Sequence, residues 1–402
     1  GVSPFASGLD LMTQGFANGL YYDPNTHPQG DALSRLLLLS DQIRVGLAGN
    51  LADYEFIDRN GDLVTGAEVD YNGQPAGYTA DPQEQIVYIS KHDNQTLYDI
   101  NAYAAPTATT TMSDRVRIQQ VGLSIVSLSQ GVPFYQAGSD MLRSKSLDRD
   151  SYNSGDWFNT LDFTYSSNNW GVGLPVAGVN QSNWFVMEPL LNNPDLQPTH
   201  DDIALSAAMY QEWLAVRYSS PLFRLETAVD VQSRLSYENV GPDQIPGLIV
   251  MNLADVGAGV ADIDPNYDWI VVLFNANDEA QTISSTTWID QNLTLHPVLA
   301  DSVDDVVKES TFDSATGTFT IPGRTTAVFV AEQTNTYYLP IIAKQASLGA
   351  TAVPADATAV AAAAVAATAV AATAVAATGV VPWVAMLAMP AMLVGVLPMR
   401  KR

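Results

Sequence analysis

The 402-residue chain contains no cysteine, so it has no disulfide, no thiolate metal ligand and no cysteine nucleophile. Histidine is scarce too. The four histidines of the chain (His27, His92, His200 and His296) are scattered and lack HExxH or comparable spacing, so a histidine-built metal site is not expected. Basic residues are also few, with 18 Lys and Arg against 43 Asp and Glu, which gives a net charge of −25. A surface this acidic repels phosphate, so nucleic-acid binding is not expected.

Two short apolar segments each lead directly into a polar cluster. Residues 86–90 (IVYIS) precede KHDNQ, and residues 132–138 (VPFYQAG) precede SDMLRSKSLDRDSYNSGDW. Continuous apolar runs of this length are typical of strands buried in a parallel sheet.

Helical patterns separate and follow these strands. A helix is predicted over 113–131, with Ser113 as its N-cap and Gly131 at its end, and others over 31–51 and 202–218. The repeated order of strand, polar loop and helix indicates the C-terminal part of a (β/α)8 barrel over residues 1–218, with the polar clusters on loops where such barrels place active sites. Two βα units cannot close a barrel, so we expect the remaining strands before Gly1, in a longer protein of which this chain is a fragment.

The pattern changes after Ser219. Strand-like segments separated by Asp, Asn, Pro and Gly predict an antiparallel β-sandwich over 219–333. The fold class expected is therefore α/β followed by all-β. The predicted strands are 247–255, 269–277, 293–301 and 318–330.

The C-terminal composition is different again. Residues 334–378 contain repeated Ala, Thr and Val, including the pentad AATAV, and predict a low-complexity spacer, with an Ala-rich helix as the alternative. Residues 379–399 are uncharged and apolar over about 20 residues, the length of a bilayer-spanning helix, despite Pro382 and Pro390. The basic end at 400–402 would stay cytoplasmic. The sequence thus predicts a membrane anchor that holds the folded part at the extracellular face.

The first polar cluster has the chemistry of a sugar site. Sugar hydroxyls donate to a carboxylate such as Asp93 and exchange hydrogen bonds with imidazole and amide groups such as His92 and Asn94. Taken alone, the His92-Asp93 pair is equally compatible with a loop ion pair or a helix cap.

The two clusters together resemble the pullulanase-type starch debranching enzymes, which include bacterial pullulanases and plant limit dextrinases in the α-amylase superfamily of glycoside hydrolases. The resemblance rests on YISKHDNQTLYDI and RSKSLDRDSYNSGDWFN, and extends over about residues 2–331. It implies a barrel followed by a β-sandwich, and hydrolysis of α-1,6 branch linkages in pullulan, amylopectin and limit dextrins with retention of configuration.

The resemblance also implies roles for individual residues. Asp93 matches the carboxylate that stabilises the transition state, and His92 and Asn94 match its neighbours on the same sugar. Asp150 matches a substrate-binding acid. Four further residues of the second cluster are substrate-binding candidates that are equally suited to supporting the loop: Arg143, Arg149, Asn153 and Asp156.

The catalytic nucleophile and acid/base that the resemblance implies are not in this chain. Asp10, in GLDLM, lacks the arginine two residues earlier that marks the family's nucleophile, so we expect a structural role for it. No glutamate matches the acid/base motif. We therefore expect the 402 residues alone to be inactive.

Other polar and aromatic features are less specific. No cofactor is expected to be required; the acidic stretch 301–307 leaves calcium open, but it lacks EF-hand spacing and is typical of a solvated loop. Trp157, Trp170 and Trp184 are suited either to stacking on sugar rings or to packing. The functional alternatives are a non-catalytic cell-surface α-glucan-binding protein and an α-1,4-acting relative, although SKSLDRDSYNSGDW argues against the latter.

Overall fold

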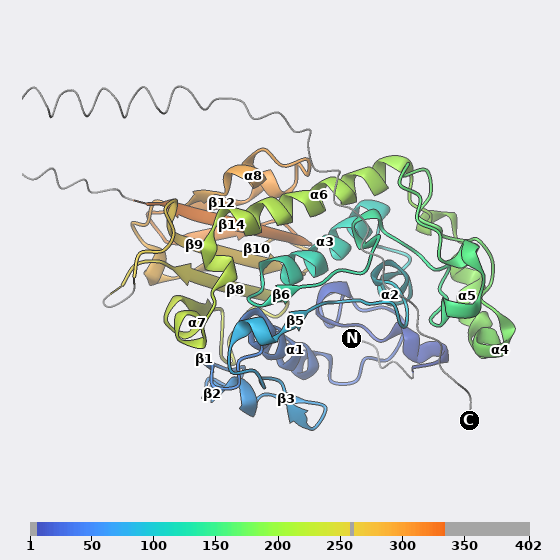
Figure 1. Ribbon diagram of the computed structural model, residues 1–402, viewed down its shortest axis with the longest axis horizontal. Helices are drawn as coiled ribbons and strands as arrows, with labels where there is room; N and C mark the ends of the chain where they lie inside the picture. The colour runs from blue at the N-terminus through green and yellow to red at the C-terminus, as the bar shows by residue number, and fades with distance from the viewer. Residues whose placement is uncertain (1–5, 258–260, 334–402) are drawn as a thin grey trace, which may run out of the picture. The chain divides into compact units, whose positions relative to one another are not determined.

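The structure, a computed structural model, describes residues 6–257 and 261–333. They belong to one compact unit (Figure 1). Its helices are α1 Ala32–Leu47, α2 Leu97–Ala104, α3 Met112–Leu128, α4 Ala177–Asn180, α5 Trp184–Leu191, α6 His200–Ser219, α7 Ala228–Arg234 and α8 Pro297–Ala300. Its strands are β1 Glu55–Ile57, β2 Leu63–Thr65, β3 Asp70–Tyr71, β4 Gln74–Pro75, β5 Ile86–Val87, β6 Val132–Pro133, β7 Leu235–Glu238, β8 Leu248–Ala254, β9 Tyr267–Asn275, β10 Gln281–Ser284, β11 Thr294–Leu295, β12 Thr311–Asp313, β13 Thr318–Ile321 and β14 Thr325–Glu332.

The two strands predicted before the polar clusters pair in parallel. In β5 and β6, Ile86 lies opposite Val132 and Val87 opposite Pro133. The backbone N–H of Phe134 adds one more hydrogen bond, at 2.8 Å, to the carbonyl of Val87. The ladder is shorter than the predicted segments 86–90 and 132–138, but its direction confirms the parallel arrangement.

Helix α3 begins earlier than predicted. Its N-cap is Thr111 rather than Ser113, because the side chains of Thr111 and Asp114 bond each other's backbone N–H groups in a capping box. The helix ends at Leu128, three residues before Gly131. It packs against both α6 and β14 (Figure 1), so it is buried on more than one side.

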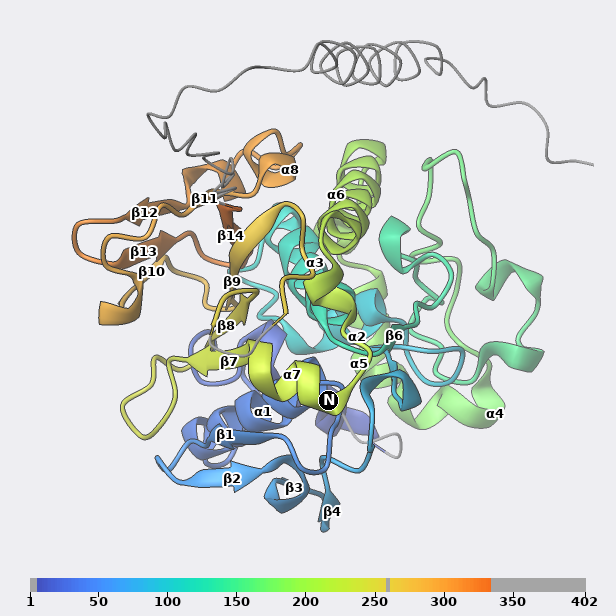
Figure 2. The same ribbon diagram turned by 60° about the vertical axis from the view of Figure 1, so that its left-hand side comes forward.

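The second half of the unit consists of two antiparallel sheets, as predicted (Figure 2). The strand orders are β11-β14-β9-β8-β7 and β10-β13-β12. Phe319 of the smaller sheet packs against Phe329 of the larger sheet and against Trp288. The centroid of its ring lies 4.8 Å from that of Phe329 and 4.9 Å from that of Trp288.

Two predicted strands are corrected. The segment 293–301 contains only the two-residue β11 and then α8, because Pro297 at the first helical position favours a helical turn. The segment 318–330 is split into β13 and β14 by the turn at Pro322, whose ring cannot donate to a ladder.

The membrane prediction is also corrected. Among residues 6–257 and 261–333, no helix has the length and apolar character needed to cross a bilayer. The longest, α6, carries Asp201, Asp202, Glu212 and Arg217. The predicted spanning segment 379–399 and the spacer 334–378 lie outside the described residues. We therefore withdraw the transmembrane helix, the membrane contact and the cell-surface location that depended on it.

One hydrophobic core extends across the boundary predicted at residue 218. It includes Leu128 of α3 and Val216 of α6 together with Val250, Val272 and Phe329 of the larger sheet. The assignment of residues 1–218 and 219–333 to two domains stays a prediction.

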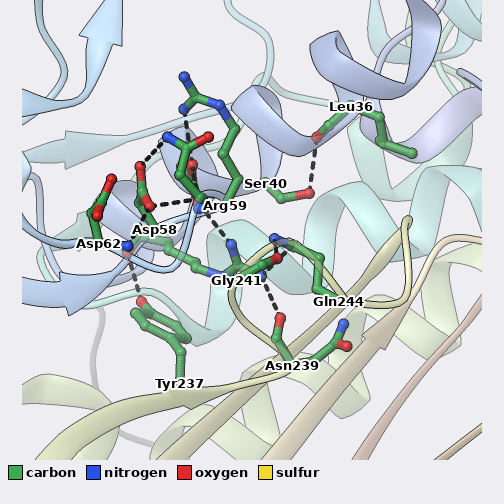
Figure 3. A network of polar contacts seen from close by, with 12 residues as sticks. Leu36, Ser40, Asp58, Arg59, Asp62, Tyr237, Asn239, Gly241 and Gln244 are labelled. Carbon is green, nitrogen blue, oxygen red and sulfur yellow. Dashed lines mark hydrogen bonds and ion pairs between the residues drawn. The ribbon is translucent and has the colours of Figure 1, made fainter.

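A buried polar network joins α1 to the loops that flank β1 and β7 (Figure 3). Arg44 donates from Nη1 to Asp41 at 2.8 Å, and from Nη2 to Gln244 Oε1 and to the carbonyl of Asn239, each at 2.8 Å. Arg59 donates to the second oxygen of Asp41 at 3.0 Å. The side chains of Asp41 and Arg44 are fully buried. A charge buried in this way is stable only while its partner is present.

We expect Asp41→Asn to lower the free energy of unfolding by about 3–5 kcal/mol, because it removes the ion-pair partner of the buried Arg44 guanidinium. Urea unfolding followed by circular dichroism measures this loss. The control is Asp305→Asn, which removes an exposed ion pair with Lys308 and should leave the unfolding midpoint unchanged. Equal effects of the two substitutions would contradict the role given to the network.

His296 is a second buried polar group, at the start of α8. Its Nδ1 accepts a hydrogen bond from the N–H of Val298 at 3.2 Å, so Nε2 carries the proton and faces Ser219 Oγ at 2.9 Å. Burial lowers the pKa of His296 to about 4. An imidazole in an unfolded chain has a pKa of about 6.5, so the unfolded state binds more protons between these two values. The stabilisation is complete above about pH 6.5 and is lost as the pH falls towards 4.

The wild-type chain should therefore lose up to about 3 kcal/mol of unfolding free energy through this group between pH 7 and pH 4. His296→Asn keeps an acceptor for the Val298 N–H but does not titrate. The difference in unfolding free energy between variant and wild type should therefore shrink as the pH falls. Urea unfolding at pH 7, 5.5 and 4 measures it. The exposed His200→Asn serves as control, and a difference that stays constant with pH would refute the assignment.

Candidate functional site

The parallel pairing of β5 and β6 places two polar loops at one edge. The carboxyl ends of neighbouring parallel strands meet at the same edge of a sheet, where α/β proteins place their ligands. The turn after β5 contains Lys91, His92, Asp93 and Asn94, and the loop after β6 contains the longer cluster from residue 139 onward. The predicted site residues of both clusters thus follow adjacent strands.

Asp93 is exposed and negatively charged. Lys91 Nζ lies 2.5 Å from Asp93 Oδ2, and His92 Nε2 lies 3.4 Å from the same oxygen. The hydrogen bond from Lys91 lowers the pKa of Asp93, and the charges of His92 and Lys145 add to this effect. Asn94 adopts a positive φ of 62°, which asparagine tolerates better than most residues, and so makes the turn tight. The carboxylate is therefore presented to solvent in its ionised form.

Residues of the second loop differ in how far they are available to a ligand. Arg143 is half-buried and donates to the carbonyls of Ala137 at 2.9 Å and Asn159 at 3.4 Å, which favours a supporting role. Arg149 donates to the carbonyl of Ala6 at 3.1 Å.

The side chains of Asp150, Asn153 and Asp156 are exposed. Asn153 lies in a short 3-10 helix, Ser151–Asn153, and Asp156 begins the next one, Asp156–Phe158. In the described part of the chain, no hydrogen bond or ion pair joins Asp93 to Asp150 or Asn153. The structure thus pairs the side chains of His92 and Asp93, and Asp150 and Asn153 are not bonded to this pair in the described residues.

Buried charged residues that the sequence analysis missed organise the second loop. Asp148 is fully buried and accepts from the N–H of Asp150 at 2.9 Å and from Ser154 Oγ at 2.5 Å. Asp99, on α2, accepts from Ser144 Oγ at 2.5 Å and from the N–H of Lys145 at 2.8 Å. Burial raises the pKa of Asp99, and these hydrogen bonds oppose the rise. No apolar periodicity marks these residues, because Asp148 lies in a loop and Asp99 is a polar residue in the first turn of α2.

The tryptophans divide between packing and exposure. Trp170 is buried against Tyr98, with ring centroids 5.7 Å apart, and Trp184 donates to the carbonyl of Pro175 at 2.9 Å. Trp157 is 58% exposed, so its face is accessible to a ligand.

Two further acidic candidates each have a basic side chain beside them. Asp10 is exposed on a 3-10 helix, Gly8–Met12, with its carboxylate 4.0 Å from His27 Nε2. In the acidic stretch 301–307, Asp304 is paired with Arg117 and accepts from the N–H of Val306. Among the residues described, no group of three or more potential side-chain ligands could hold a metal ion.

Comparisons with known proteins give, over most of the chain, the same family as the resemblance found in the sequence. Residues 165–332 match the family model "Alpha-1,6-glucosidases, pullulanase-type, C-terminal". The chain is 47% identical over 337 residues to Pullulanase 1, chloroplastic, of Arabidopsis thaliana, covering 82% of this chain and 34% of that protein. It is 39% identical over 336 residues to a pullulanase of Klebsiella pneumoniae, covering 83% of this chain and 30% of the relative.

Solved structures give a consistent result. The maltotriose complex of the Klebsiella pneumoniae pullulanase superimposes with a TM-score of 0.78 at 38% identity, over 83% of this chain and 35% of that one. A Klebsiella oxytoca pullulanase gives a TM-score of 0.77 at the same identity, over 83% of this chain and 31% of that one. The chain spans about a third of the length of the curated relatives it matches. The chain belongs to the pullulanase-type α-1,6-glucosidase family, and its residues 165–332 match that family's C-terminal model.

Proposed function

We propose that the protein hydrolyses α-1,6-glucosidic branch linkages in pullulan, amylopectin and limit dextrins, and that this chain supplies part of the substrate-binding surface. The observation that carries the proposal is the ionised, exposed carboxylate of Asp93 beside His92, at the carboxyl end of a parallel strand. Relatives at 47% and 39% identity are named pullulanases, and one pullulanase structure similar to this chain contains maltotriose, which supports an α-glucan as the ligand.

Asp93 would hold the sugar at the cleavage point. A carboxylate accepts hydrogen bonds from sugar hydroxyls, and it attracts the positive charge that develops on an oxocarbenium-like transition state. His92, whose side chain is exposed, would contact the same sugar, and Asn94 would complete the turn. Lys91 occupies one oxygen of Asp93, so a sugar hydroxyl would have to share or displace that hydrogen bond.

The second loop would contact the glucan further along. Asp150 and Asn153 present exposed polar groups there, and the accessible face of Trp157 suits the apolar face of a sugar ring. Arg143 and Arg149, which donate to backbone carbonyls of the chain, would support this loop as well as contact substrate.

Hydrolysis with retention also requires a carboxylate nucleophile and a carboxylic acid/base about 5–5.5 Å apart. No residue of this chain matches those two groups of the family. We propose that they come from residues outside it, so that the 402 residues alone bind glucan but do not cleave it.

The test is Asp93→Asn in the protein that carries this sequence, with pullulan hydrolysis followed by release of reducing ends. Removing a charge that acts in the transition state should lower kcat at least about 10²-fold, with a smaller effect on KM. Asp201→Asn, which removes an exposed carboxylate on α6, is the control and should retain wild-type rates. Near-normal hydrolysis by the Asp93→Asn variant would rule out the role proposed for Asp93.

A further inference from the structure

Lys145 is a buried lysine that connects the two polar loops. Its residue is only 1% exposed, and lysine is almost never buried to this extent unless its charge is engaged. Nζ donates to the backbone carbonyl oxygen of His92 at 3.3 Å. His92 directly precedes Asp93, so this bond ends on the turn that presents the proposed sugar-binding carboxylate.

The other end of Lys145 is held independently. Its backbone N–H donates to Asp99 Oδ2 at 2.8 Å, and Ser144 Oγ donates to Asp99 Oδ1 at 2.5 Å. Asp99 lies in the first turn of α2, whose N-cap Thr96 follows the sugar-binding turn by two residues. The lysine backbone is thus fixed to α2, while its side chain extends back to the start of the turn.

Charged groups from both loops and from α2 surround the ammonium. Burial lowers the pKa of Lys145, and the carboxylates of Asp99, Asp148 and Asp93 oppose this change, while Arg143 adds to it. Three carboxylates against one guanidinium thus offset part of the cost of burying the ammonium. Methionine, which is one heavy atom shorter than lysine and unbranched, would keep most of the packing but remove both the charge and the donor.

We propose that Lys145 is a positioning residue for α-glucan binding: its ammonium holds the His92 carbonyl and so sets where Asp93 lies relative to the loop that carries Asp150. The inference rests on the proposed function, since it assigns Lys145 to the same sugar-binding edge. Lys145 itself is buried and does not touch the sugar. Its hydrogen bond to His92 links the turn after β5 to the loop after β6. In the described residues, no hydrogen bond or ion pair joins Asp93 directly to Asp150.

A purely structural lysine would behave differently. If Lys145 only filled space in the second loop, its loss would loosen residues 142–159 and α2 and lower overall stability. If it positions the turn, its loss should loosen residues 88–95 selectively, with the rest of the unit unchanged. Amide hydrogen exchange resolved by peptide separates these two effects.

The experiment compares Lys145→Met, Lys145→Arg and the surface control Lys308→Met in the full chain. Hydrogen exchange, thermal midpoint and maltotriose affinity by calorimetry are measured for each. We expect Lys145→Met to exchange at least about tenfold faster in residues 88–95 alone and to bind maltotriose at least about tenfold more weakly, because small displacements of a binding group are costly. Lys145→Arg keeps a cationic donor, so its exchange protection in residues 88–95 and its maltotriose affinity should both lie between those of Lys145→Met and the wild type. Lys308→Met should match the wild type.

Unchanged exchange in residues 88–95 would overturn the inference, as would loosening spread over α2 and residues 142–159. Faster exchange with unchanged maltotriose affinity would also overturn it, because the tie would then not serve the sugar. If the wild-type chain fails to bind maltotriose, the proposed function fails with it. The exchange data distinguish that result, because they report the link between Lys145 and the turn without any ligand.

Discussion

The burial of α3 on several sides at once is the constraint on which the rest of the structure depends. Its side chains form hydrogen bonds on different sides of the helix. Gln120 accepts from Trp213 of α6 at 3.1 Å, and Ser124 Oγ lies 2.7 Å from Thr326 Oγ1 of β14. Gln119 donates to the carbonyl of Ser139 at 2.7 Å. Because α3 lies between β5 and β6 in the chain and ends just before β6, these contacts fix where β6 can start. They join the helical part, the larger sheet and the second polar loop in one packed arrangement.

The site combines this rigidity with exposure. Asp99, Lys145 and Asp148 are buried and bonded, whereas Asp93 is open to solvent and held negative by its neighbours. A buried charge must keep its partners, so these three residues resist displacement. An exposed carboxylate on such a frame can exchange its lysine partner for a ligand hydroxyl without disturbing the loops beneath it. The buried charges thus hold the two loops in place, while Asp93 stays accessible to a ligand.

Sequence reasoning succeeded where a local signal was strong. The helices later seen as α1, α3 and α6, the parallel direction of β5 and β6, and the antiparallel sheets all followed from apolar runs and turn residues. It failed where local chemistry competed with the pattern. Thr111, not Ser113, is the N-cap of α3, because Asp114 completes a capping box with it. Pro297 starts the short helix α8 within a segment that was expected to be a strand. A run of apolar residues was also taken for a membrane span that no described helix supports.

The sequence by itself determined the residue types of the turn after β5, the place of this turn after a short apolar strand, and the family. These features depend on residues that are adjacent in the chain. The tertiary structure alone decided how the two polar loops are tied together. Lys145 and His92 are 53 residues apart, and Arg44 and Gln244 are 200 apart. Nothing in either local pattern indicates these pairs, because a contact between distant residues forms only when the packing of the intervening helices and strands brings them within hydrogen-bond distance.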